Sequence, residues 1–257
     1  MKPSRLISCL AVATIAGTMP LCAQVETNTP PPKPKPRWES TLTAGLTLTR
    51  GNSRTMTASG DVKTQKKWDQ NELKFGLDGT YGETRDQTTG NDNVNPNMIH
   101  GFGQYNRLFS ERLFGYARAE GLHDEVADVT YRVPVSLGLG YYFIKKTDTD
   151  LDAEIGPGYI WQKQGGLIDN FATLRVSENF NHKLSDRAKI WQKAEWLPKV
   201  EDFNYYIVNA EVGISAALTE DKKLSLTVTL NYTYASQPAA GRVKNDTTLK
   251  TGITYAF

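Results

Sequence analysis

Apolar and polar residues alternate with a period of two along most of the chain from Trp38 onward. In "TLTAGLTLT" (41–49), leucine and alanine occupy every second position, with threonine and glycine between them. The stretches "VPVSLGLGYYF" (133–143) and "LSLTVTLNYTY" (224–234) repeat this pattern. Because successive side chains of a strand point to opposite faces, the pattern predicts β-strands with one apolar and one polar face.

About twelve strands are predicted, and no segment after the N-terminus has a convincing helical period. Most exceed the roughly 5–6 residues of a typical soluble strand and suit the roughly 9–11 tilted residues that cross a bilayer. We therefore expect an all-β fold, an antiparallel up-and-down transmembrane β-barrel of about twelve strands. The fourth segment alternates poorly, so its register is open. The predicted segments are 38–49, 54–67, 72–83, 97–109, 112–123, 129–145, 149–162, 170–183, 186–197, 204–218, 223–235 and 247–257.

The connections between these segments alternate in length. Every second one is a tight turn, whereas the others include long polar loops at 84–96, 198–203 and 236–246. The first connection, "RGNS" (50–53), is short and departs from the trend. Outer-membrane barrels place short turns in the periplasm and longer loops outside. This parity favours a barrel with both ends in the periplasm.

The N-terminus resembles a secretory signal. Lys2 and Arg5 precede an apolar run that is too short to span a membrane, and cleavage after Ala23 is expected. The alternatives are an N-terminal membrane anchor or a lipoprotein modified at Cys22. We thus expect a signal peptide (1–23), a proline-rich periplasmic spacer (24–37) and an outer-membrane barrel (38–257), located in the bacterial outer membrane. The spacer could instead be a ligand for another protein.

Composition excludes several classes. The chain has 257 residues, a net charge of +2 and 23% charged residues, so a nucleic-acid partner is not expected. The mean hydropathy of −0.48 would place the mature chain among soluble proteins on a helix-based scale. The two cysteines, Cys9 and Cys22, both precede the proposed cleavage site. The mature protein would then depend on packing and backbone hydrogen bonds alone.

Alternation does not reveal which face points inward. A soluble barrel buries its apolar face, whereas a membrane barrel presents that face to lipid. With lipid outside, the polar face lines a lumen with seven acidic and seven basic residues, which favours internal ion pairs over a strongly selective pore. The candidate lumen charges are Asp61, Lys63, Lys74, Asp78, Arg118, Glu120, Asp152, Glu154, Arg175, Lys189, Lys193, Glu195, Glu211 and Lys250.

Aromatic residues gather near the strand ends, which favours contact with outer-membrane lipids, because aromatic rings prefer the two headgroup zones. General aromatic enrichment in strands is the alternative. At the turn edge the expected girdle comprises Trp38, Trp68, Phe143, Phe180, Tyr255 and Phe257. At the opposite edge it comprises Tyr81, Tyr131, Tyr159, Trp161, Trp196 and Tyr234.

The last strand resembles the C-terminal assembly signal of bacterial outer-membrane barrels. Lys250, Gly252, Tyr255 and Phe257 match its polar residue, its glycine and its two aromatic or apolar positions. The last strand must pair with the first, because an open edge in lipid leaves backbone groups without partners. The barrel-assembly machinery is therefore an expected partner, docking this strand by edge addition.

The segment "WESTLTAGLTLTRGNSRTMTASGDVKTQKKW" and the later "LDGTYGETRD", "YNRLFSERLFGYARAEGLHDE" and "EIGPGY" are similar to the YdiY-like family of outer-membrane proteins described as salt-induced. The resemblance covers roughly 38–257. It implies a barrel and a link to salt or envelope stress. The family has no accepted function and no catalytic or ligand residues to carry over.

Candidate chemistry is sparse. Barrel enzymes need a serine activated by histidine, and His100, His123 and His182 have no such arrangement, so each is expected to be a loop or interface residue. Asp150, Asp152 and Glu154 share a strand face that could bind a surface cation, but they lack the glycine and glutamate of a calcium loop. No catalytic residue, metal site or cofactor is predicted.

The expected function is a narrow passive channel for ions or small solutes. The main alternative is a structural or stress-related barrel with a salt-bridge-filled, closed lumen. A lipid-modifying enzyme is the remote alternative. A ring of charges of one sign would favour the channel, whereas compensated pairs filling the lumen would favour the closed barrel.

Overall fold

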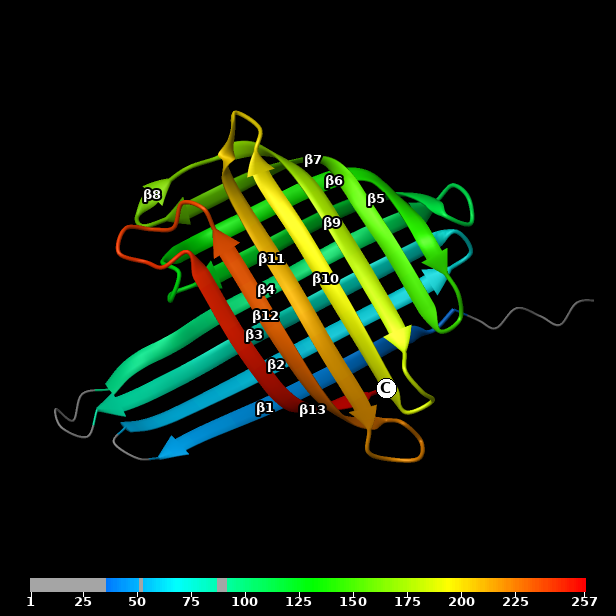
Figure 1. The fold of residues 1–257 in the computed structure, drawn as a ribbon, viewed down its shortest axis with the longest axis horizontal. Coiled ribbons are helices and arrows are strands. Elements are labelled where there is room, and N and C mark those ends of the chain that lie inside the picture. Colours follow the sequence, from blue (N-terminus) through cyan, green and yellow to red (C-terminus); the bar gives the residue numbers. More distant parts are fainter. Residues whose placement is uncertain (1–35, 51–52, 87–91) are drawn as a thin grey trace, which may run out of the picture. The chain divides into compact units, whose positions relative to one another are not determined.

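The computed structural model describes residues 36–50, 53–86 and 92–257 (Figure 1). The predicted signal peptide and most of the predicted spacer lie outside this range. In the described part all regular structure is β, in strands β1 (Trp38–Arg50), β2 (Ser53–Trp68), β3 (Asn71–Asp86), β4 (Asp92–Leu108), β5 (Leu113–Asp124), β6 (Val129–Lys145), β7 (Thr149–Gln164), β8 (Leu167–Ile168), β9 (Phe171–Lys183), β10 (Ala188–Lys199), β11 (Asp202–Ala217), β12 (Leu224–Ala235) and β13 (Asn245–Ala256). No helix in these residues is long and apolar enough to cross a membrane.

The strands form one closed antiparallel barrel of twelve long strands, and the two-residue β8 pairs with the end of β7. Each long strand pairs with its neighbours in the sequence, and β1 pairs with β13 to close the ring. The predicted fold class and strand number are thus confirmed. We call the end near Trp38 and Phe257, where β2 meets β3 in a tight turn, the turn end. The opposite end, where β12 meets β13, is the loop end.

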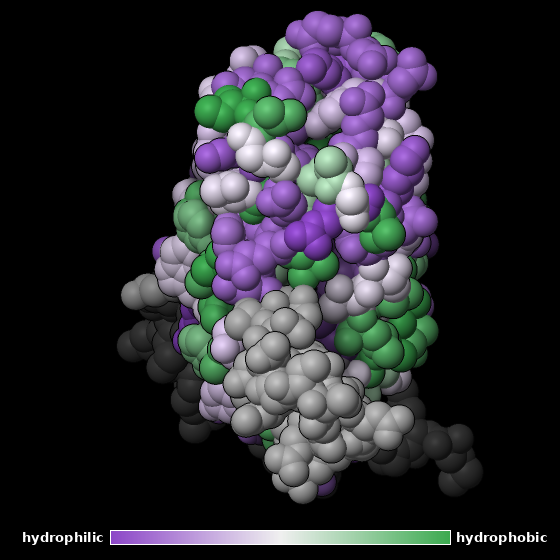
Figure 2. Space-filling model, turned by 90° about the vertical axis from the view of Figure 1, so that its left-hand side faces the viewer, coloured by the Kyte–Doolittle hydropathy of each residue, from purple (hydrophilic) through white to green (hydrophobic). Residues whose placement is uncertain are grey.

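Exposure alternates along the strands and decides which face points inward. On β6, Leu137 and Leu139 are 62% and 52% exposed, whereas Arg132 and Ser136 are only 7% and 6% exposed. The same alternation runs through β7 and β9. The apolar face is therefore the outer wall and the polar face lines the interior, opposite to a soluble barrel. Figure 2 looks onto the loop end and shows mainly hydrophilic residues there, with hydrophobic residues gathered along parts of its flanks.

The poorly alternating fourth segment belongs to β4, and the structure explains its pattern. Gln104 and Asn106 are buried inside the barrel, and the Phe102 ring also lies inside, under the guanidinium of Arg118 at 4.2 Å. The outward positions between them are Gly101 and Gly103. Small residues on the outer face and mixed residues on the inner face hide the period of two, although the backbone register from Asn97 to Leu108 is regular and the register shift against β3 lies before it.

The predicted difference in loop length is wrong for two of the three long loops, whereas 236–246 is a long connection, since β12 ends at Ala235 and β13 begins at Asn245. The loop expected at 84–96 is mostly strand, since β3 continues to Asp86 and β4 begins at Asp92. The loop expected at 198–203 is only the turn Val200–Glu201 between β10 and β11. Backbone hydrogen bonds between neighbouring strands do not depend on side-chain polarity, and a register shift at Pro198 accommodates the proline.

The seam between β1 and β13 is short. Thr41–Ala44 pair with Ile253–Ala256, and Ser40 and Phe257 exchange two further backbone hydrogen bonds of 3.2 and 3.0 Å. Beyond this pairing the two strands diverge towards the loop end (Figure 1). The closure of the barrel therefore depends on few residues.

A ladder of hydroxyl groups reinforces the inner side of this seam. Thr43 Oγ1 lies 2.8 Å from Thr254 Oγ1, which lies 2.7 Å from Thr227 Oγ1. Thr227 donates in turn to Ser215 Oγ at 3.0 Å. The ladder links β1, β13, β12 and β11 through neutral hydrogen bonds, each contributing about 1 kcal/mol.

Substituting Gly252 with valine is expected to prevent closure of the seam. A Cβ atom at this position would lie 2.6 Å from the carbonyl oxygen of Ala44, inside van der Waals contact with rigid backbone. We expect the variant to lose the heat-sensitive shift in gel mobility that marks a folded barrel, even when it is refolded in detergent without any assembly machinery. Thr251→Val, on the exposed outer face, is the control. A folded Gly252→Val protein would contradict this role of the glycine.

Candidate functional site

The interior of the barrel brings the predicted charges together in clusters. The first is centred on Arg175 of β9. Its Nη1 donates to Glu154 of β7 and its Nε donates to Glu195 of β10, both at 2.6 Å. Gln104 Nε2 and Ser177 Oγ donate to Glu154 at 2.7 and 3.3 Å. Because Gln104 belongs to β4, its bond to β7 passes over β5 and β6 and spans the interior.

The same network continues to β3. Gln104 donates to Asn106 at 2.9 Å, and Asn106 donates to Glu72 at 2.9 Å. Lys67 and Lys74 form ion pairs with Glu72 at 2.9 and 3.3 Å. Glu72, Asn106 and Gln104 are all at most 5% exposed. A hydrogen-bonded belt thus fills the side of the lumen between β3 and β10.

The second cluster is centred on His100 of β4. Its Nδ1 lies 2.9 Å from Asp78 Oδ1 and its Nε2 lies 3.1 Å from Glu120 Oε2. Carboxylates only accept hydrogen bonds, so both bonds form together only with the doubly protonated imidazolium. Arg118 pairs with Glu120 at 2.6 Å, and Lys250 of β13 reaches Asp78 of β3 at 3.2 Å. His100, expected in a loop or an interface, is instead an interior strand residue.

The third cluster joins β2 to β11 across the seam. Lys63 Nζ lies 3.8 Å from Glu211 Oε1 and 3.5 Å from Asp61 Oδ2. Lys193 Nζ lies 3.5 Å from Glu211, which also accepts a hydrogen bond from Trp191 Nε1 at 2.6 Å. Because β1, β12 and β13 lie between β2 and β11, this contact also spans the interior.

A fourth group lies nearer the loop end. Arg132 Nε donates to Gln162 Oε1 at 2.8 Å, and Gln162 Nε2 donates to Tyr205 OH at 2.7 Å. Lys199 pairs with Asp169 at 3.2 Å. Beside them is a buried apolar cluster of Ile160, Phe171, Leu197 and Ile207. A second apolar cluster, Phe114, Tyr116 and Tyr142, lies inside near the turn end.

The accessibility of the charged residues divides the lumen into two halves. Between β4 and β9 lies the packed half, where Glu154 and Arg175 are 2% and 5% exposed. Along β2, β10 and β11 lies the open half, where the side chains of Lys63 and Lys193 are 38% and 41% exposed. Lys189 on β10 is exposed as well. The open half is therefore accessible to water, whereas the packed half is filled by side chains.

Aromatic residues of the predicted girdle occur as ring pairs near both ends of the outer wall. Near the turn end, Tyr255 lies 6.1 Å from Phe257. Nearer the loop end, Tyr159 lies 4.7 Å from Trp161. Of the predicted set, Trp38, Tyr81, Tyr131, Phe143, Tyr159, Trp161, Tyr255 and Phe257 are exposed, and Trp68, Phe180, Trp196 and Tyr234 are partly buried.

The predicted assembly signal lies at the seam. Lys250 faces the interior, Gly252 lies against Ala44, and Phe257 pairs through its backbone with Ser40. Gly252 and Phe257 therefore contact β1 at the seam, the outward-facing Tyr255 pairs there through its backbone with Leu42, and Lys250 links β13 to Asp78 of β3. Recognition by an assembly machinery stays a prediction.

The acidic stretch on β7 does not form a joint cation site. Asn181 donates to Asp150 at 2.8 Å and Asn179 donates to Asp152 at 2.9 Å, whereas Glu154 is held by Arg175. In the described chain, no group of three or more His, Cys, Asp or Glu side chains is arranged to hold a metal ion. Each carboxylate of this stretch bonds separately to β9.

Sequence reasoning missed several interior polar residues, which come from β3, β4, β6 and β7. For the interior residues of β4 a signal exists in the sequence. With Gly101 and Gly103 as outward positions, the residues that alternate with them point inward. The missed residues are Glu72, His100, Gln104, Asn106, Arg132 and Gln162.

Replacing His100 with leucine is expected to lower the free energy of unfolding by about 1–3 kcal/mol, because two carboxylates each lose a donor. The loss stays moderate because Lys250 and Arg118 still pair with Asp78 and Glu120. Urea unfolding in detergent, followed by tryptophan fluorescence, measures it. His182→Leu is the control, since in the described structure the only side-chain hydrogen bond of His182 is to the neutral Thr149, beside a ring stack with Phe180. Equal stability of the two variants would show that the His100 bridge is energetically neutral.

Comparison with known proteins gives a family and a fold. A family model described as "Protein of unknown function, DUF481" matches residues 42–257. No curated protein matches the chain.

Several solved barrels are similar in structure. The NanC porin aligns with a TM-score of 0.52 at 9% identity, over 84% of this chain and 98% of the porin. An outer membrane channel from Pseudomonas putida F1 aligns with a TM-score of 0.48 at 11% identity, over 86% of this chain and 94% of that channel. The KdgM porin aligns with a TM-score of 0.45 at 10% identity, over 86% and 99%. At 9% identity the likeness to the NanC porin concerns the fold alone.

Proposed function

This chain belongs to the DUF481 family of proteins of unknown function, and from that premise we propose that it is an integral outer-membrane barrel forming a narrow passive channel for small ions or solutes. The outward apolar wall and the aromatic pairs near both of its ends support placement in a membrane. The secretory signal in the sequence supports export. The turn end then faces the periplasm and the loop end faces the outside.

The observation that carries the channel is the water-accessible open half of the lumen. A filled barrel would bury its interior charges on all sides, as the packed half does. Lys63 and Lys193 are instead about two-fifths exposed, although Lys63 forms an ion pair that spans the interior. A path along β2, β10 and β11 remains for water and small solutes, and the packed half limits its width.

The exposed charge of this path is mainly lysine. Lys63, Lys189 and Lys193 are more accessible than Asp61 and Glu211, whose side chains are 22% and 21% exposed. Because a pore prefers ions of the sign opposite to its exposed charge, a weak preference for anions follows. Strong selectivity is not expected, since both carboxylates lie beside the lysines.

The second candidate is a barrel with a closed lumen. It is favoured by the compensated ion pairs of the interior, above all Arg175 with Glu154 and Glu195 and Lys250 with Asp78.

We assign no catalytic role: both ring nitrogens of His100 are held by carboxylates, and no serine–histidine hydrogen bond occurs in the described residues. The family resemblance supports a link to salt stress. Growth of a deletion strain in high salt tests this link, and unimpaired growth would contradict it.

Conductance of the refolded mature chain (24–257) in a planar bilayer tests the proposal. We expect small discrete steps and, across a salt gradient, a reversal potential indicating a weak anion preference. Heat-dependent gel mobility shows separately that the protein is folded. A folded protein without steps would support the closed lumen and contradict the channel. Fractionation as a soluble periplasmic protein would contradict the membrane placement.

A further inference from the structure

The outer wall of β9 and β10 carries two polar side chains in an apolar field. Glu178 occupies an outward position of β9, between the inward Ser177 and Asn179. Gln192 occupies an outward position of β10, next to the inward Lys193. Polar side chains in the middle of the strands usually face the interior of this barrel. The carboxylate of Glu178 and the amide of Gln192 are exceptions, because they lie midway along the outer wall.

The strand register makes Glu178 and Gln192 neighbours. Glu178 lies opposite Ala194 and Gln192 lies opposite Phe180, so the two residues are diagonal partners across the β9–β10 pair. Side chains at such positions are about 7–8 Å apart. Ala153 on β7 and Ala194 on β10 flank Glu178. These short side chains leave room for another surface to approach the carboxylate.

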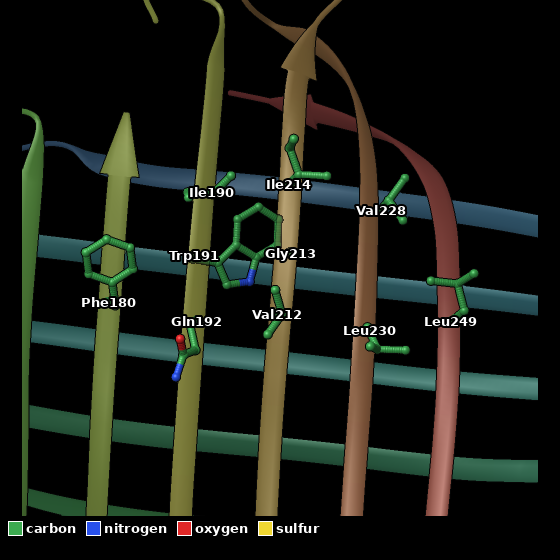
Figure 3. A pocket seen from close by; sticks show the side chains of 10 residues that line it. All are labelled: Phe180, Ile190, Trp191, Gln192, Val212, Gly213, Ile214, Val228, Leu230 and Leu249. Atoms are coloured by element: carbon green, nitrogen blue, oxygen red, sulfur yellow. The ribbon is translucent and has the colours of Figure 1, made fainter. Parts of the chain in front are cut away.

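Gln192 also lines an apolar groove on the outer wall (Figure 3). Apart from Gln192, Trp191 and Gly213, the groove is lined by aliphatic residues and Phe180, from β9 to β13. The lining comprises Phe180, Ile190, Trp191, Gln192, Val212, Gly213, Ile214, Val228, Leu230 and Leu249. Figure 3 shows the Gln192 amide beside the Phe180 ring and Val212.

Within the described structure, neither Glu178 nor Gln192 has a hydrogen bond or an ion pair through its side chain. In lipid an unpaired amide or carboxylate is costly, and acyl chains offer no partner. The two groups are complementary, since a carboxylate accepts and an amide donates. A two-fold axis between two copies would place each Glu178 opposite the other copy's Gln192. Two equivalent hydrogen bonds would then form, and each of the four side chains would have a partner.

We propose that the outer wall of β9–β12 is an interface between two copies of this chain, held by reciprocal Gln192–Glu178 hydrogen bonds. This inference rests on the proposed membrane placement, because only lipid makes the unpaired groups costly. The partner's outer wall covers the apolar groove, and the lumens of the two barrels remain separate.

Cysteine crosslinking tests the interface, because both native cysteines precede residue 24. Ala194→Cys, on the proposed interface, is expected to form an oxidised dimer in native membranes. Val135→Cys, an equally outward position on β6, is the matched control and is expected to stay monomeric. Crosslinking of both or of neither would overturn the proposal.

Dimer stability gives a second test. In mild detergent, Gln192→Leu and Glu178→Leu are each expected to weaken the dimer about tenfold or more. Glu178→Gln, which keeps an acceptor, is expected to retain it. Unchanged affinity in both leucine variants, or a monomer with lipid bound in the groove, would overturn the interface. Heat-dependent gel mobility separates the two proposals: a folded membrane barrel that is monomeric overturns the interface alone, whereas a protein absent from the membrane overturns both.

Discussion

Arg175→Met is expected to lower the free energy of unfolding of the barrel by about 3–5 kcal/mol, the usual effect of removing one partner from a buried ion pair. The Arg175 side chain is 6% exposed, and its partners Glu154 and Glu195 are 2% and 13% exposed. Without the guanidinium, Glu154 keeps only neutral donors, Gln104 and Ser177. Two carboxylates would then share a poorly hydrated site without a cation bonded to either of them.

Guanidinium unfolding in detergent micelles, followed by tryptophan fluorescence, measures this loss. Arg107→Met is the matched control, because Arg107 is exposed and donates to Asn71 at 2.9 Å. The control is expected to change stability by no more than about 0.5 kcal/mol. Adding Glu154→Gln and Glu195→Gln to Arg175→Met is expected to recover part of the loss, since the repulsion disappears. A loss below about 1 kcal/mol for Arg175→Met would show that water reaches the packed half.

The barrel was predictable because its main signal is local. The alternation in 133–143 and 224–234 reports a face of each strand directly, and β6 and β12 match those predictions within a few residues. Strand number and order follow from twelve such segments with short connections. Loop lengths were less predictable, because β3 and β4 continue through polar residues wherever their backbones can still pair.

The interior network was predictable only in part. Sequence periodicity places Arg175 and Glu154 on inward faces, but it does not tell that they meet, since that depends on the register between β7 and β9. Contacts such as that between Lys63 and Glu211 are even harder to predict from the sequence, because they join strands separated by most of the chain. The division into a packed and an open half arises from these distant contacts, so no local pattern could have revealed it.

This division relates stability to transport. The packed half has buried ion pairs whose loss destabilises the fold, whereas the open half has exposed pairs of small energetic weight. Substitutions in the open half should therefore change ion flow while the barrel stays folded. The closed-lumen alternative gives no such separation, because there no charge would face a conducting path.

Replacing both Lys63 and Lys193 with glutamate is expected to convert the weak anion preference into a cation preference. The side chains of these two lysines, which both pair with Glu211, are 38% and 41% exposed. Replacing them with glutamate therefore makes the accessible surface of the open half acidic. We expect the ratio of cation to anion permeability to rise by about tenfold. The reversal potential of single channels across a potassium chloride gradient measures it, and the shift should shrink at high salt because exposed charges are screened.

Two further variants make this result interpretable. Lys63→Gln with Lys193→Gln should give an intermediate reversal potential and avoids new repulsion around Glu211. Lys223→Glu, an exposed change between β11 and β12, makes the same substitution outside the lumen and should leave the reversal potential unchanged. If the lumen variants conduct with the selectivity of the unmodified protein, the conducting path does not follow β2, β10 and β11. A shift confined to the lumen variants would locate the path, because only a charge beside the moving ions changes their preference without changing the fold.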